Sequence, residues 1–219
     1  MKQINWRYAL GEILIVILGI SIAFTLNSWK EKSANNQLRN QYLGALQSEI
    51  EDESEELDSL GQFMSDRSQL IGFMGYSLLN PQLPGRDSVL GLLFEVAEGP
   101  IYHETDVTYQ TLVNSGDLRL IDDLDLRKSI EAHYSTHDQI KRSFFRLDNI
   151  YADYLGKYFV EEIDYLAVRS NDFSSLENAY FQNILYSLAG AFQFGSKSID
   201  RCAASNAKLL EILRAYRNL

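Results

Sequence analysis

The feature that most constrains this chain is an apolar run near its amino end, Gly11–Trp29, which contains a single acidic residue, Glu12. A helix over residues 8–29 would be about 33 Å long, and the hydrocarbon core of a bilayer is roughly 30 Å thick. Aromatic side chains, which anchor helices at membrane surfaces, stand near both ends of this run: Trp6, Tyr8 and Trp29. We therefore expect residues 8–29 to form a transmembrane helix.

The same run has an alternative interpretation as a cleaved signal peptide, with Ser21-Ile22-Ala23 as a small-x-small cleavage site. The apolar run continues beyond that site, and this favours a retained span. Basic residues flank both ends, so the positive-inside rule is nearly balanced. We expect a short cytoplasmic tail, residues 1–7, and a periplasmic domain, residues 30–219, because a large acidic domain is translocated regardless of local charge.

Charge and cysteine content exclude several classes of partner and site. The formal net charge of -10 argues against a nucleic-acid partner, because phosphate binding needs concentrated Lys and Arg. The single cysteine, Cys202, excludes a disulfide framework within the chain and any zinc site of several cysteines. We expect Cys202 to be a small buried residue on a helix, and no sequence pattern predicts a cofactor.

A helical pattern continues from the span far into the rest of the chain. No proline precedes Pro81, and apolar residues recur at spacings of three, four or seven between Leu38 and Leu78. The first helix is therefore expected to reach a turn at residues 80–86. An acidic run, Glu49–Asp58, lies within it, and we expect its acids to form the solvated side of the helix. It lacks the turn glycine of a calcium loop, so a cation site there is disfavoured.

The second half of the chain predicts two short helices and then two long ones. The first short helix is expected to be capped by Asp87 or Ser88 and to run to Glu98, and the second is expected over residues 107–114 and to be ended by Gly116 in the left-handed conformation. A long helix capped by Asp122 or Asp123 is expected to reach Leu166, because apolar and aromatic residues recur every seven positions. Its partner is a final helix that begins near Ser174 or Ser175.

The predicted fold class is all-α, because no segment alternates with period two over more than a few residues. The N-terminal transmembrane helix continues into a soluble helical bundle of long antiparallel helices, with two short helices between them.

Two blocks of the sequence resemble an uncharacterised bacterial family of small single-pass membrane proteins. The first is Tyr8–Ile20 followed by Asn27-Ser28-Trp29, and the second is Thr108–Ile121 followed by Leu126-Arg127 and Tyr134. That family opens with a similar Gly-Glu-Ile membrane helix and carries a Tyr-x-x-Leu-x-x-Ser-Gly-x-Leu-x-Leu-Ile segment. The resemblance implies a location in the bacterial inner membrane, and it assigns no activity.

One side of the predicted span carries polar and small residues. At 100° per residue, five positions fall within an arc of about 80°: Glu12, Val16, Gly19, Ala23 and Asn27. Such a stripe lets another helix approach closely and bond to the polar groups, which predicts a contact with a partner or a second copy. Two alternatives concern Glu12: its carboxyl group extends to the membrane surface, or it handles a proton or cation, as in stator subunits.

His133 and His137 are the weak candidates for a metal site. They are four residues apart, so both imidazoles lie on one helical face. No Glu follows His133 as in zinc proteases, and a third ligand would have to be a remote residue such as His103 or Glu104. Both histidines also lie on the apolar stripe, which favours satisfied core or interface histidines, with a pH-responsive element as a further alternative.

Taken together, the sequence predicts a non-enzymatic single-pass membrane protein that acts as an assembly, scaffold or accessory subunit. Its expected partners are the lipid bilayer and either copies of itself or another membrane protein complex. One alternative is a helical ligand-sensing domain that signals through a membrane partner. The other is a proton- or cation-coupled stator-like subunit that uses Glu12.

Overall fold

The chain is all-α, as predicted. The computed structural model describes the backbone of residues 6–80, 82 and 89–217, and the side chains of residues 10–80, 82 and 89–216. No strand occurs among these residues. The elements in chain order are α1 (Trp6–Leu79), α2 (Val89–Ala97), α3 (Val107–Ser115), the 3₁₀ turn η2 (Asp117–Leu120), α4 (Leu124–Ile150), the π-helical turn η3 (Tyr151–Leu155), α5 (Gly156–Glu161), α6 (Tyr165–Arg169) and α7 (Ala179–Arg217).

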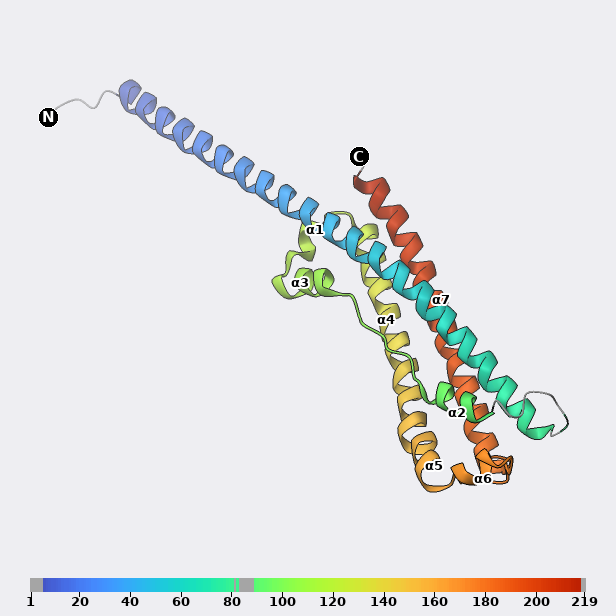
Figure 1. Cartoon of the computed structure of the whole chain (residues 1–219). Helices are drawn as coiled ribbons and strands as arrows, with labels where there is room; N and C mark the ends of the chain where they lie inside the picture. The colour runs from blue at the N-terminus through green and yellow to red at the C-terminus, as the bar shows by residue number, and fades with distance from the viewer. Residues whose placement is uncertain (1–5, 81, 83–88, 218–219) are drawn as a thin grey trace.

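Three long helices make the bundle (Figure 1). The second half of α1 and the whole of α4 run away from the amino-terminal end, and α7 returns antiparallel to both. Most long-range contacts of the chain join α7 to α1 and to α4. The short helices α2 and α3 lie on one side of this bundle, and α5 and α6 close its far end. This is the predicted layout of long antiparallel helices with short ones between them.

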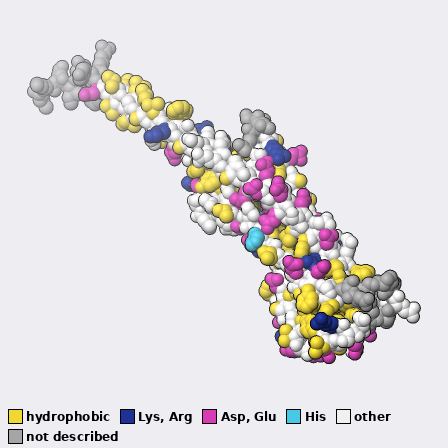
Figure 2. Space-filling view, in the orientation of Figure 1, with side chains coloured by type: hydrophobic (Ala, Val, Ile, Leu, Met, Phe, Trp, Pro, Cys, Tyr) yellow, Lys and Arg dark blue, Asp and Glu magenta, His cyan; other side chains and the backbone are white. Residues whose placement is uncertain are grey.

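Helix α1 is unbroken for 74 residues, and its environment changes along its length. The window of α1 hydrophobic enough to cross a membrane has no buried residue, whereas Leu43 and Leu46 are completely buried in the bundle. Figure 2 shows the consequence as an apolar rod that projects from a bundle covered with acidic side chains. The predicted continuation of the apolar helix into the helical bundle is confirmed, and its apolar part is long enough to cross a membrane.

The core of the bundle is divided into two hydrophobic clusters. The cluster nearer the span includes Ile50 of α1, Ile130 of α4 and Leu209 of α7. The cluster farther from the span begins at Leu57 of α1 and Ile140 of α4. Buried polar residues lie between the two clusters: Glu53, His133, His137 and Asn206. We call these four residues the polar layer.

Two helix boundaries differ from the predictions. The fourth helix does not reach Leu166, because α4 passes into η3 and α5 and then stops at Glu161. The Asp164 carboxylate accepts hydrogen bonds from the backbone N–H groups of Leu166 and Ala167, and this starts a separate helix, α6. Likewise α7 begins at Ala179 and not near Ser174, because the Asn178 side chain caps it through Phe181 N–H.

Other boundaries follow the sequence. Asp123 caps α4 by accepting from the N–H groups of Asp125 and Leu126. Gly116 follows α3 with φ of 74°, the left-handed conformation that glycine adopts without steric cost. The expected caps of α2 at positions 87 and 88 lie outside the described residues.

A pair of phenylalanine substitutions tests this packing. Phe192 of α7 is completely buried and packs near Phe63 of α1, with ring centroids 6.5 Å apart, whereas Phe145 of α4 is 68% exposed. We expect Phe192→Ala to lower the free energy of unfolding by about 3–5 kcal/mol, because it removes a buried ring and leaves a cavity. The matched control Phe145→Ala should change it by less than about 0.5 kcal/mol. The measurement is denaturant unfolding in detergent, followed by circular dichroism. Equal effects of the two substitutions would contradict the packing of α7.

Candidate functional site

The first candidate site is the polar side of the span. All five predicted residues are exposed on the free part of α1: Glu12, Val16, Gly19, Ala23 and Asn27. A Cβ atom built on Gly19 would meet nothing within 4 Å among the described residues. The chain therefore leaves this side of the helix open, and the structure tests neither a partner nor any chemistry there.

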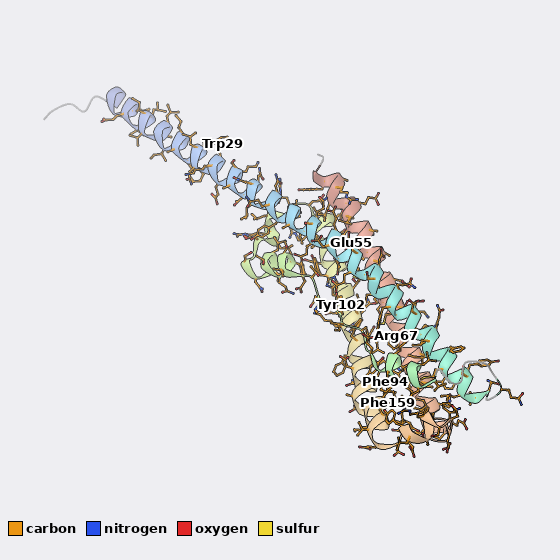
Figure 3. All side chains as sticks on the ribbon, viewed as in Figure 1. Trp29, Glu55, Arg67, Phe94, Tyr102 and Phe159 are labelled. Atoms are coloured by element: carbon orange, nitrogen blue, oxygen red, sulfur yellow. The ribbon has the colours of Figure 1, made fainter. Side chains whose placement is uncertain are left out.

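Of the predicted interfacial anchors, only Trp29 has a described side chain. It is 72% exposed, and Figure 3 shows it on the free part of α1, outside the bundle. The side chains of Trp6 and Tyr8 lie outside the described part of the structure.

The second candidate site consists of three residues of the polar layer, Glu53, His133 and His137, together with Cys202. His133 and His137 come from α4, where their spacing of four residues places both on the side that faces α1 and α7. Glu53 comes from α1 and Cys202 from α7, and all four side chains are at most 2% exposed. Their donor atoms (imidazole nitrogens, a carboxylate oxygen and a thiol sulfur) all lie within 4.8 Å of one another. The spacing in the sequence predicted that His133 and His137 lie on one helical face, but it did not predict that Glu53 and Cys202 lie beside them.

Glu53 corrects the interpretation of the acidic run. The exposed side chains of Asp52, Glu55 and Asp58 agree with a solvated helix side, but Glu53 is 2% exposed. Glu53 lies midway between Ile50 and Leu57, the two apolar residues seven apart, so its helical position is on the buried side. That spacing was the available sequence evidence that one acid of the run turns inward.

Glu53 lies between the two imidazoles. Its Oε2 is 3.2 Å from His133 Nε2, and its Oε1 is 2.9 Å from His137 Nε2. The distances are short, but none of the four imidazole nitrogens makes a well-aligned hydrogen bond, and neither does Glu53 Oε1. Buried polar atoms without aligned partners each cost about 1–3 kcal/mol. The predicted burial of the histidines is confirmed, whereas their hydrogen bonding is incomplete.

The close contacts shift the protonation of this cluster. Burial alone would lower the pKa of His137, but the neighbouring Cys202 and Glu53 outweigh it and raise the pKa to about 10. Burial acts to raise the pKa of Glu53, yet the contacts with His133 and His137 lower it overall. In the absence of a ligand the cluster is therefore a buried ion pair between Glu53 and His137.

The connection between α2 and α3, residues 98–106, passes over this cluster. Figure 3 shows Tyr102 at mid-height in the bundle, and its buried hydroxyl has no hydrogen-bond partner. Burial and then the charge of Glu53 raise the pKa of Tyr102. The carboxylate of Glu104 lies 3.6 Å from His137 Nδ1 and 2.6 Å from Lys141 Nζ. Of the two remote residues considered as metal ligands, Glu104 therefore reaches a histidine, whereas His103 is exposed.

Two other acids of α1 hold the same connection in place. Glu56 Oε1 accepts a hydrogen bond from the backbone N–H of His103, at 3.3 Å. Glu49 Oε2 accepts one from the backbone N–H of Thr108, at 3.0 Å, in the first turn of α3. Because Glu49, Glu53 and Glu56 are spaced by four and three residues, they lie on one side of α1. The acidic run thus organises the surroundings of the polar layer.

Comparisons with protein-family models, with curated proteins and with solved structures found no match. The resemblance of this chain to a family of single-pass membrane proteins therefore stays an expectation.

The ion pair predicts how stability depends on pH when a chelator keeps the protein free of metal. The pKa of His137 rises from 6.5 to about 10 on folding, so its contribution is complete below pH 6.5 and is lost as the pH rises towards 10. The pKa of Glu53 falls below 4.5, so its contribution is complete above pH 4.5 and is lost in more acidic solution. The ion pair should therefore contribute most to the free energy of unfolding between pH 4.5 and pH 6.5.

The Glu53→Gln variant isolates this effect, because Gln keeps the shape of the side chain without its charge. Its free energy of unfolding, measured by denaturant titration, should decline less than that of the wild type between pH 6.5 and 10. Identical pH profiles of the two proteins would contradict the ion pair.

Proposed function

We propose that the protein is a non-enzymatic, single-pass subunit of the bacterial inner membrane that assembles with copies of itself or with another membrane complex. Its span provides the contact, and its helical bundle is held in the periplasm. The observation that carries the proposal is the continuity of α1, which joins the exposed apolar segment directly to the core of the bundle.

This continuity sets the distance between the bundle and the bilayer. Leu43 is the first fully buried apolar residue of α1, and it follows Trp29 by 14 positions, or about 21 Å of helix. Residues 30–38 between them are each exposed, but several of them line a pocket with Arg119, Leu120 and Asp122 around the η2 turn. The core of the bundle therefore begins well beyond the span, whereas the η2 region lies beside the end of the span, and α1 joins the span to the core without a break.

The stripe of the span supports assembly within the membrane. Glu12 and Asn27 are exposed and have no partner among the described residues. In hydrocarbon an unpartnered carboxyl or amide group is costly, so both groups favour a neighbouring helix that bonds to them. Gly19 and Ala23 between them leave space for that helix to approach closely.

The acidic bundle supports the proposed orientation. The net charge of -10 disfavours contact between the bundle and anionic lipid on the cytoplasmic side. A large acidic domain is translocated regardless of local charge, which agrees with a bundle in the periplasm.

Substitutions in the span test the assembly. We expect the double variant Glu12→Leu, Gly19→Leu to weaken association by at least about 10-fold, because it removes an interhelical hydrogen bond and blocks close approach. The measurement is the size of the protein in mild detergent by light scattering, together with cross-linking in native membranes. An unchanged particle size would contradict the proposal.

Two further variants serve as controls. Ser21 lies about 180° from Glu12 around the helix, so Ser21→Leu makes a similar change on the opposite side and should leave assembly intact. Glu12→Gln keeps a hydrogen-bonding group without a titratable one, and should also retain assembly. Loss of assembly with Ser21→Leu would show that the polar stripe is not the contact.

A further inference from the structure

We propose that Glu53, His133, His137 and Cys202 bind one Zn²⁺ ion, which joins the three long helices of the bundle. This site lies outside the span and is independent of the assembly proposed above.

The positions of the donor atoms support an ion over a simple polar core. Carboxylate, imidazole and thiolate are the usual protein ligands of zinc, at about 2.0–2.3 Å from the metal. Four such ligands in a tetrahedron lie roughly 3.3–3.6 Å from one another. The donor atoms of the four residues already lie within 4.8 Å of one another, so small side-chain movements suffice.

The incomplete hydrogen bonding is the second independent observation. His133 and His137 are at most 1% exposed, and their nitrogens lack aligned hydrogen-bond partners. Both Nε2 atoms lie close to the Glu53 carboxylate, at 3.2 and 2.9 Å from its two oxygens. A cation at that point would replace these two poorly aligned contacts with coordination bonds, and so remove the cost of burying these groups.

Charge balance favours a divalent cation. With Glu53 ionised, Cys202 as thiolate and both histidines neutral, the donors carry two negative charges, which one divalent ion neutralises. A neutral centre is the least costly arrangement in the interior of a bundle, because isolated charges are strongly disfavoured there. Binding would displace protons from the cluster, in the way that metals compete with protons for their ligands.

The donor types select the class of metal. Mg²⁺ and Ca²⁺ prefer six or more oxygen ligands, whereas this site offers two nitrogens, one sulfur and a single carboxylate. Four protein donors in a buried position, with no open place for substrate, are typical of structural zinc sites. Zinc is therefore expected to stabilise the bundle by connecting α1, α4 and α7.

The surroundings of His137 match the outer shell of such sites. A histidine that binds zinc usually gives its second ring N–H to a carboxylate, which fixes the orientation of the ring. The Glu104 carboxylate lies near this ring nitrogen, with its Oε1 3.6 Å from His137 Nδ1, just beyond hydrogen-bond distance, so a small side-chain rotation would complete the bond; Lys141 holds the same carboxylate. The geometry makes His137 Nε2 the zinc ligand and Glu104 a positioning residue.

The test uses the full-length protein in mild detergent, stripped with a chelator and then supplied with Zn²⁺. We expect one zinc per chain by elemental analysis and a raised melting temperature, because a ligand that binds only the folded state stabilises it. His133→Ala should weaken zinc binding by more than about 100-fold, and Glu104→Gln by about 10- to 100-fold. The control His103→Ala, at an exposed histidine on the same connection, should leave affinity unchanged.

Cobalt provides a readout that does not depend on the stability of variants. Co²⁺ in the wild-type site should show strong visible bands typical of tetrahedral geometry, together with a near-ultraviolet band from the thiolate. Cys202→Ser should lose the thiolate band while helix content by circular dichroism stays the same.

Three results would overturn the proposal. They are a wild-type protein that retains no zinc after excess metal is removed, a wild-type cobalt spectrum without a thiolate band, and a folded His133→Ala variant with wild-type zinc affinity. None of these results bears on assembly through the span, so the two proposals fail separately.

Discussion

The packing of α7 between α1 and α4 is the constraint on which the structure depends. Each long helix buries one apolar stripe, and no pair of them encloses a core alone. At one level the three stripes are interrupted by polar residues, where Glu53 of α1 meets His133 and His137 of α4. Burying an acid and two imidazoles at the centre of a bundle is costly unless they are paired, so the packing that forms the core also brings these groups within contact distance of one another.

The same helix connects two environments with opposite requirements. Over the first part of α1 the surroundings proposed here are lipid, so an apolar surface is favourable and the polar residues Glu12 and Asn27 require partners. Over its second part the surroundings are other helices and water, so apolar residues face inward and acids are placed by the contacts they make. Because α1 has no break between these parts, the apolar segment and the polar layer have a fixed separation along one helix.

Much of this architecture was predictable from local patterns. The helical period and the placement of proline predicted the long helices, the end of α1 just before residue 80 and the partnership between α4 and α7. Asp123 and Gly116 marked the limits of helices through well-understood capping chemistry. The two wrong boundaries lie where a polar side chain caps a new helix: after α5 stops at Glu161, the Asp164 carboxylate starts the separate helix α6, and Asn178 caps the start of α7. In both places apolar residues keep the helical spacing across the boundary between two helices, so their pattern does not predict where the second helix is capped.

By itself, the sequence determined the class of fold, the apolar segment and the pairing of His133 with His137 on one helical face, because each depends on residues close together in the chain. Only the tertiary structure brought Glu53 and Cys202 to those histidines, because they are far apart in the sequence. Glu53 precedes His133 by 80 positions, and Cys202 follows His137 by 65 positions. It also turned one acid of a charged run inward while its neighbours stayed in solvent. The physical reason is that a helix pattern determines which side of a helix a residue occupies, whereas the neighbours on that side depend on how three helices pack together.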